Sequence, residues 1–228
     1  MTQQHNHQLS FTSPVLLFGA APVMPSTLEC AKQIAGWPVL AADGGLENAR
    51  KCGLLPQAVI GDMDSAHDLD QLPAAVQRIT LSGQDDTDFE KSLRIISAPL
   101  IVGIGFLDGR FDHALAALDT LARLPDDQPI LLVGNHDVLL RLRGDFSAAL
   151  PVASRLSVWP LGRQHFLAST GLEWPLDDIH MAFGTRTGTS NRVIDQSVSI
   201  QPATGDGYAV IAPFDAFDAM LDAAMRIA

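Results

Sequence analysis

The sequence predicts an α/β fold, in which a mostly parallel, Rossmann-like sheet flanked by helices precedes a smaller antiparallel β-sandwich. In the first half of the chain, short and continuously apolar segments alternate with helical patterns, as in parallel strands buried on both faces. From about Leu139 the apolar segments are shorter, partly alternating, and separated by Gly, Pro and Asp, until a helical pattern returns in residues 214–228. We therefore expect an α/β domain in residues 1–142 and a β-sandwich domain with a C-terminal helix in residues 143–228.

The elements of the first domain follow from local patterns. Its strands are expected at residues 14–22, 38–45, 57–62, 77–82, 99–106 and 129–134, and its helices at residues 26–34, 46–51, 89–97 and 112–124. Ser26 is a plausible N-cap of the first helix, and Gly53 ends the second. Asp86 or Thr87 can cap the third, and Glu90 follows Thr87 by three residues, as in a capping box.

The second domain is expected to be a small antiparallel sandwich or barrel, because its apolar runs are short and bounded by turn residues. These runs occupy residues 138–150, 154–162, 180–191, 196–202 and 207–213. The final segment, residues 214–228, has the pattern of an amphipathic helix.

Composition and charge argue against several classes of protein. The 228 residues are 47% hydrophobic and 18% charged, which favours a sizeable core over disorder. A formal net charge of −11 argues against nucleic acid or an anionic membrane as the main partner. Only two cysteines occur, Cys30 and Cys52, and we find no signal peptide and no apolar run long enough to span a membrane, so we expect a cytoplasmic location.

Carboxylates gather where the predicted strands end. Asp43, Asp62 and Asp112 follow three different strands, and ligands of open α/β sheets bind beyond such strand ends. Asp62 and Asp64 are two residues apart, so in extended backbone they face the same side and can share one Mg²⁺ ion. Taken alone, this pair is as well explained by a helix N-cap followed by a solvated carboxylate.

Further candidates lie near predicted helix N-termini. Asp88 is a candidate metal-binding or catalytic carboxylate, and Lys91 and Arg110 are candidate phosphate contacts. Asp43 and Gly44 stand where a helix N-terminus could meet a phosphate. Ordinary helix capping is the alternative explanation for the acidic residues, and a solvated helix face is an equally good explanation for Lys91.

Five short motifs occur in a characteristic order. They are DGG at residues 43–45, GDMDS at 61–65, QDDTDFEKSL at 84–93, GRFDH at 109–113 and GTSN at 188–191. The Walker and dinucleotide-binding glycine motifs are absent from the sequence. As an ordered set spanning most of the chain, the five motifs resemble the thiamine pyrophosphokinase family.

This resemblance implies that the chain transfers the diphosphoryl group of ATP to the hydroxyl of thiamine, giving thiamine diphosphate and AMP. It implies Mg²⁺ and ATP in the first domain, thiamine at the second, and a homodimer with active sites between subunits. The implied metal and catalytic residues are Asp43, Asp62, Asp64, Asp88 and Asp112; Gln84 and Arg110 would assist near the phosphates; and Ser190 and Asn191 would lie in the thiamine pocket.

Some choices stay open at this level. Asp88 or Asp112 could accept the proton of the alcohol, and Trp159 or Trp174 could contribute cation–π attraction to thiamine. A pyrophosphokinase acting on a pterin alcohol, a Mg²⁺-dependent nucleotide phosphohydrolase and a nucleotide-sensing module are the alternative functions. The Ser190–Asn191 pair favours thiamine over a pterin. The presence of Asp62, Asp64, Asp88 and Asp112 argues against a sensing module.

Overall fold

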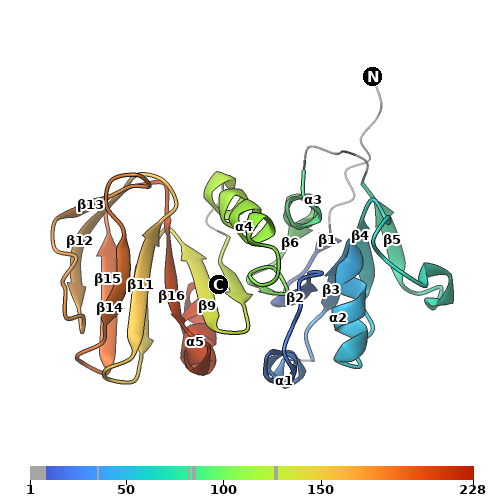
Figure 1. Ribbon diagram of the computed structural model, residues 1–228, viewed down its shortest axis with the longest axis horizontal. Helices are drawn as coiled ribbons and strands as arrows, with labels where there is room; N and C mark the ends of the chain where they lie inside the picture. The colour runs from blue at the N-terminus through green and yellow to red at the C-terminus, as the bar shows by residue number, and fades with distance from the viewer. Residues whose placement is uncertain (1–8, 35, 82, 84–85, 126–127) are drawn as a thin grey trace. The chain divides into compact units, whose positions relative to one another are not determined.

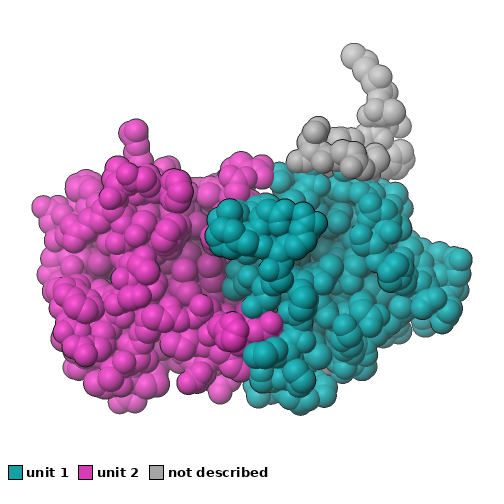
Figure 2. Space-filling model, in the orientation of Figure 1, with its two compact units in different colours: residues 1–117 teal, residues 118–228 magenta. Residues whose placement is uncertain are grey.

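The computed structural model describes residues 9–34, 36–81, 83, 86–125 and 128–228 (Figure 1). The chain forms two compact units, unit 1 with residues 1–117 and unit 2 with residues 118–228 (Figure 2). The division falls within helix α4 (Phe111–Arg123), whereas the sequence places the domain boundary after residue 142. The functional boundary at residue 142 stays a prediction.

Unit 1 contains a parallel sheet with the strand order β7-β2-β3-β4-β5. The strands are β2 (Val15–Phe18), β3 (Val39–Ala42), β4 (Ala58–Gly61), β5 (Gln77–Thr80) and β7 (Ile101–Ile104). Every residue of β2, β3, β4 and β7 is buried, which explains their uninterrupted apolar sequences. In β5, which ends this order, only Ile79 is buried.

The helices of unit 1 connect these strands. They are α1 (Pro25–Gln33), α2 (Leu46–Lys51), α3 (Asp88–Ile95) and the first part of α4, with 3₁₀ turns at Asp43–Gly45 and Leu69–Gln71. Two short strands, β1 (Leu9–Ser10) and β6 (Ile96–Ser97), pair in parallel and were not predicted. Two-residue strands are too short to give a periodic pattern.

The observed helix N-termini can be compared with the predicted N-caps. The bounds of α2 match the prediction, and Thr87 is confirmed as the N-cap of α3, because its Oγ1 accepts a hydrogen bond from the Glu90 N–H at 3.2 Å. The prediction that Ser26 caps α1 is wrong. That helix begins at Pro25, whose fixed φ suits the first helical position, and Met24 takes the N-cap position.

Unit 2 contains two antiparallel sheets, with strand orders β8-β9-β16-β11-β14 and β10-β15-β12-β13. The strands of the first sheet are β8 (Ile130–Val133), β9 (Asp137–Leu142), β11 (Arg155–Pro160), β14 (Gly188–Arg192) and β16 (Tyr208–Pro213). Those of the second are β10 (Phe146–Ala149), β12 (Gln164–Thr170), β13 (Ile179–Met181) and β15 (Ser197–Pro202). The sixth predicted strand, β8, thus pairs antiparallel with β9 within unit 2.

The core of unit 2 is formed by side chains from both sheets and by the C-terminal helix. Phe166 of β12 meets Tyr208 of β16 edge-on, with ring centroids 5.1 Å apart, and both are fully buried. Helix α5 (Phe217–Ile227) follows a 3₁₀ turn at Phe214–Ala216 and contacts β8, β9 and β10. In the described part of the chain, no helix combines the length and apolar character needed to cross a membrane.

Candidate active site

A pocket of about 540 Å³ lies in unit 1, beyond the carboxyl ends of β2, β3, β4 and β7. The loops that follow these strands and the start of α3 and α4 line it. Among its lining residues are Gly19, Asp43, Gly44, Asp64, Ser65, Thr87, Asp88, Gly105, Phe106, Arg110 and His113. This is the position at which open α/β sheets bind their ligands.

Asp43 follows β3 and is the most buried carboxylate of the site, with 1% of its surface exposed. Its Oδ2 accepts a hydrogen bond from the Ser65 N–H and its Oδ1 one from the Ala66 N–H, each at 3.1 Å. Burial raises the pKa of Asp43 despite the bond from Ser65, and the neighbouring Asp88 and Asp64 raise it further. Asp43 therefore anchors the loop that carries the other carboxylates.

The carboxylates of Asp43, Asp62 and Asp64 converge, and oxygen atoms of the three lie within 4.8 Å of one another. Gly61 makes this approach feasible: it has φ +154°, and a Cβ there would lie 2.7 Å from the Asp43 Cβ and 3.0 Å from Asp88 Oδ1. Met63, between the two predicted ligands, has a φ of 69°, so the pair is not in the extended backbone that the sequence suggested. A left-handed turn brings the carboxylates together instead.

Lys91 bridges two of the aspartates from within the protein. Its Nζ lies 3.1 Å from Asp62 Oδ2 and 3.1 Å from Asp88 Oδ1, and 5% of its side chain is exposed. The hydrogen bond from Lys91 lowers the pKa of Asp62. Burial opposes the charge on Lys91, but the bonds to Asp88 and Asp62 outweigh it, and the pKa of Lys91 is raised. The ammonium group of Lys91 is thus paired with two carboxylates, and Lys91 does not line the pocket.

Arg110 and Asp112 form a two-pronged ion pair at the start of α4. Arg110 Nε donates to Asp112 Oδ1 at 3.1 Å, and Arg110 Nη2 donates to Asp112 Oδ2 at 2.6 Å. Both side chains are largely exposed, and the bond from Arg110 lowers the pKa of Asp112. Arg110 lines the pocket and Asp112 does not. A phosphate that binds Arg110 in a two-pronged manner would compete with Asp112.

The structure brings most of the site residues predicted in the first domain together. Asp43, Gly44, Asp64, Asp88 and Arg110 line the pocket, and Asp62 and Lys91 are joined to them by the contacts above. Gln84 lies outside the described residues. Phe89 and Phe106, with ring centroids 4.4 Å apart, also line the pocket and were missed. Nothing local distinguishes them from core phenylalanines.

Ser190 and Asn191 lie on β14 in unit 2. Asn191 is buried, and its amide is committed to backbone: Nδ2 donates to the Trp174 carbonyl at 2.7 Å, and Oδ1 accepts from the Trp174 N–H at 3.1 Å. Ser190 is exposed with a φ of 59°. Trp174 is more than half exposed, at 57%, whereas the rings of Trp159 and Phe183 have centroids 6.4 Å apart. Asn191 thus fixes the backbone beneath an exposed tryptophan.

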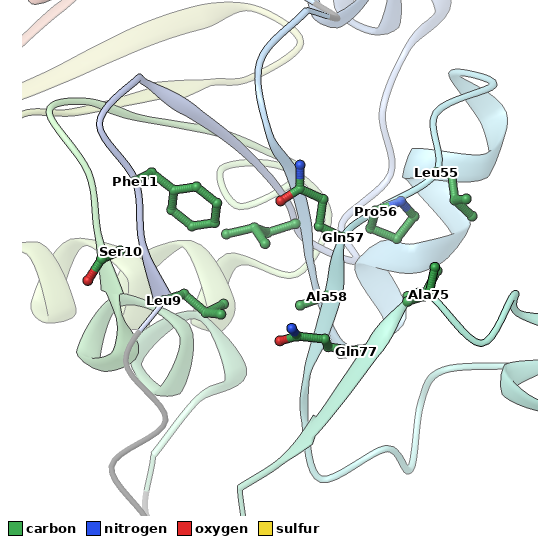
Figure 3. A pocket seen from close by; sticks show the side chains of 11 residues that line it. Leu9, Ser10, Phe11, Leu55, Pro56, Gln57, Ala58, Ala75 and Gln77 are labelled. Atoms are coloured by element: carbon green, nitrogen blue, oxygen red, sulfur yellow. The ribbon is translucent and has the colours of Figure 1, made fainter.

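A second pocket of unit 1, of about 490 Å³, lies at the opposite, amino ends of β3, β4 and β5. Figure 3 shows its lining, which includes Phe11, Leu55, Gln57 and Gln77. None of the residues that line it is charged, so it is poorly suited to a triphosphate.

Comparison with protein families gives two matches along the chain. Residues 35–132 match the model described as thiamin pyrophosphokinase, catalytic domain. Residues 152–205 match the model described as thiamin pyrophosphokinase, vitamin B1 binding domain. The first match contains the Asp43, Asp62 and Asp64 group, and the second contains Ser190 and Asn191.

Similar proteins carry the same family name. Thiamin pyrophosphokinase 1 of Caenorhabditis elegans is 28% identical over 165 residues, which cover 65% of this chain and 67% of that protein. Thiamine pyrophosphokinase 1 of Arabidopsis thaliana is 29% identical over 174 residues, covering 64% of this chain and 61% of that protein. The chain thus spans about two thirds or less of the length of these curated relatives.

Solved structures agree at the level of the fold. Thiamine pyrophosphokinase from Bacillus subtilis superposes with a TM-score of 0.73 at 19% identity, covering 89% of this chain and 100% of that chain. The enzyme from Geobacillus thermodenitrificans gives a TM-score of 0.69 at 22% identity, covering 88% and 97%. With both halves of the sequence matched in order, the chain belongs to the thiamin pyrophosphokinase family.

Proposed function

We propose that this chain transfers the diphosphoryl group of ATP to the hydroxyl of thiamine, forming thiamine diphosphate and AMP. The observation that carries the proposal is the convergence of the Asp43, Asp62 and Asp64 carboxylates within 4.8 Å, beside a pocket at the carboxyl edge of the sheet. This convergence lies in the segment that matches the catalytic-domain model. Phosphoryl transfer depends mainly on positioning and on neutralising phosphate charge, which such a site supports.

The same three carboxylates suit Mg²⁺, and Asp88 is a fourth candidate ligand. They offer only oxygen atoms, which Mg²⁺ prefers. Burial raises the pKa of Asp43, and the neighbouring Asp88 and Asp64 raise it further, so a bound cation would stabilise its charged form. When bound, the ion would neutralise phosphate charge and help to orient the triphosphate.

The protein's own side chains have separate roles in this proposal. Arg110 binds phosphate oxygens, and Gly44 lets backbone approach them. Asp88 rather than Asp112 accepts the alcohol proton, because Asp88 lines the pocket and Asp112 does not. Lys91 balances the charges of Asp62 and Asp88, and the phosphate contact predicted from sequence would require it to leave both. Gln84 assists near the phosphates.

Thiamine is proposed to bind with help from unit 2, which would serve as the β-sandwich domain beside a Rossmann-like ATP-binding domain. Ser190 contacts thiamine, and Asn191 holds the backbone of Trp174, whose exposed ring is available to a cationic ligand. A homodimer with active sites between subunits, acting in the cytoplasm, completes the proposal.

The experiment that tests this function supplies purified protein with ATP, Mg²⁺ and thiamine. AMP and thiamine diphosphate should form in equal amounts. ADP with thiamine monophosphate would contradict diphosphoryl transfer, and phosphate release without an acceptor would indicate a phosphohydrolase. A pterin alcohol offered in place of thiamine should give no AMP above background.

The double variant Asp62→Asn, Asp64→Asn tests the carboxylates. We expect the rate to fall by at least about 10²–10³-fold, because two oxygen ligands and their charges are lost from the phosphate site. Far-UV circular dichroism should show that the fold is retained. A matched control, Asp218→Asn with Asp222→Asn, removes two exposed charges from α5 and should keep full activity. Full activity in the first variant would show that the pair is only structural.

A further inference from the structure

A second group of possible metal ligands lies in unit 2, away from the aspartates of the proposed active site. His165, Asp178 and His180 each offer one ligand atom, and these atoms lie within 4.8 Å of one another. Of the two such groups found in the described part of the chain, this one alone contains nitrogen donors. We propose that it binds a divalent transition-metal ion, with Zn²⁺ as the reference ion.

The sheet positions the two histidines. Strands β12 and β13 are neighbours in their sheet (Figure 1). His165 on β12 is the direct antiparallel partner of His180 on β13, so the two side chains project from the same face of this strand pair. Their rings stack with centroids 3.9 Å apart and an interplanar angle of 9°. Cross-strand neighbours on one face present two imidazoles to one ion without any change in the backbone.

The third ligand comes from the turn that leads into β13. Asp178 Oδ1 lies 2.9 Å from His165 Nε2, while 90% of the Asp178 side chain is exposed. Asp178 has a φ of 55°, a left-handed conformation that aspartate and asparagine tolerate better than most residues. Ligand atoms around Zn²⁺ stand about 2.0–2.2 Å from the metal, so rotations of the exposed Asp178 and His180 side chains suffice to close the group.

The neighbourhood of the group supports a binding site. A pocket of about 510 Å³ is lined by both histidines, and Arg163, which is exposed, is the one permanent cation among its lining residues. Gln164 fixes the backbone beside His165 by donating to the Ala203 carbonyl at 3.0 Å and accepting from the Gly207 N–H at 3.1 Å. The floor of the site is therefore rigid, while its ligands can adjust.

The donor set defines which ion the site prefers. Two imidazoles and a carboxylate suit Zn²⁺, Co²⁺, Ni²⁺ or Cu²⁺, whereas Mg²⁺ prefers oxygen donors alone. Three protein ligands would leave one tetrahedral position of Zn²⁺ for water or another small donor. The site is thus chemically distinct from the proposed Mg²⁺ site of unit 1, and its test does not depend on enzyme activity.

The test is a titration of the purified protein with Co²⁺, followed by visible absorption, and with Zn²⁺, followed by calorimetry. Excess Mg²⁺ is present to fill the aspartate group. Because His5 and His7 could also bind metal, all samples carry His5→Gln and His7→Gln. We expect one saturable site for either ion. His180→Gln and Asp178→Asn should each weaken it by at least about tenfold, since even supporting partners of a ligand contribute that much.

His136→Gln, which changes an exposed histidine of unit 2 outside the group, should bind as tightly as the parent. Circular dichroism checks that each variant is folded; both Asp178 and His180 are exposed, so their replacement should not disturb the core. Equal affinity in the parent and in His180→Gln would overturn the proposal. So would the absence of saturable binding in the parent, which would leave His165 and Asp178 as a structural hydrogen-bonded pair.

Discussion

The aspartates of the proposed active site carry the same chemical group in different electrostatic environments. Burial raises the pKa of Asp43, while the hydrogen bond from Lys91 lowers the pKa of Asp62. The protein therefore stabilises the charged form of Asp62, whereas burial disfavours the charged form of Asp43. A cation bound by Asp43 would offset the effect of burial on that carboxylate, whereas Lys91 already offsets the charge of Asp62.

Lys91→Met is predicted to destabilise the protein by about 2 kcal/mol at neutral pH, because it leaves two partly buried carboxylates without their shared donor. The lowered pKa of Asp62 contributes stability that is complete above its ordinary value of 3.8 and is lost as the pH falls through the lowered value. The raised pKa of Lys91 contributes stability that is complete below 10.5 and is lost as the pH rises through the raised value.

Urea unfolding at a series of pH values measures this difference. The gap between the parent and Lys91→Met should be widest between pH 3.8 and 10.5 and should narrow outside that window. Lys51→Met, which removes an exposed lysine from α2, should change the free energy of unfolding by less than about 1 kcal/mol. A gap that does not change with pH would assign the effect to packing of the lysine chain.

At the scale of elements, local sequence predicted what is decided within a few residues. The bounds of α2 and the N-cap Thr87 follow from helix-forming residues and from a hydrogen bond that spans three positions. Lys91 bonds to Asp62, 29 residues away, and no local pattern specifies that partner. The left-handed turn at Met63 likewise depends on Asp43, which receives the N–H groups of the same loop. Tertiary contacts, rather than spacing in extended backbone, place the carboxylates.

Helix α5 gives a test at this scale, because two methionines lie on its different faces. Met220 is fully buried, whereas Met225 is 44% exposed. Met220→Ala should destabilise the protein by about 2–4 kcal/mol, because it removes buried apolar surface and leaves a cavity between α5 and the strands of unit 2. Met225→Ala, the same chemical change, should cost less than about 1 kcal/mol. Thermal unfolding compares the two, and similar losses would show that α5 does not contribute to the core in this way.

At the scale of the whole molecule, the proposed reaction uses residues from both units. The aspartate group lies in unit 1, and Ser190 and Asn191 lie in unit 2. The resemblance of the sequence to the thiamine pyrophosphokinase family implied this assignment of residues to two parts of the chain. The sequence did not predict the contact-based division within α4, because that helix is one continuous amphipathic pattern. The apolar periodicity of residues 111–123 predicts a helix, but it does not show that the two ends of this helix belong to different units.

Nucleotide binding should be visible as stability. A non-hydrolysable ATP analogue with Mg²⁺, at about 100 times its dissociation constant, should raise the free energy of unfolding of the unit it binds by about 2.7 kcal/mol. The increase should disappear on adding a chelator and in Asp62→Asn, Asp64→Asn. Scanning calorimetry makes the measurement, and the Asp218→Asn, Asp222→Asn protein serves as control. An equal shift in both double variants would place nucleotide binding away from the aspartates.

Because Lys91 bridges Asp62 and Asp88, we expect the chain to fold whether or not a metal ion is bound. Since the ammonium group of Lys91 already offsets Asp62 and Asp88, the chain does not need a divalent ion to hold these two carboxylates close together. Protein made during metal starvation would then accumulate as a folded, dormant pool rather than as aggregate. Under the proposed function, such a pool would gain activity when Mg²⁺ is supplied, without new synthesis.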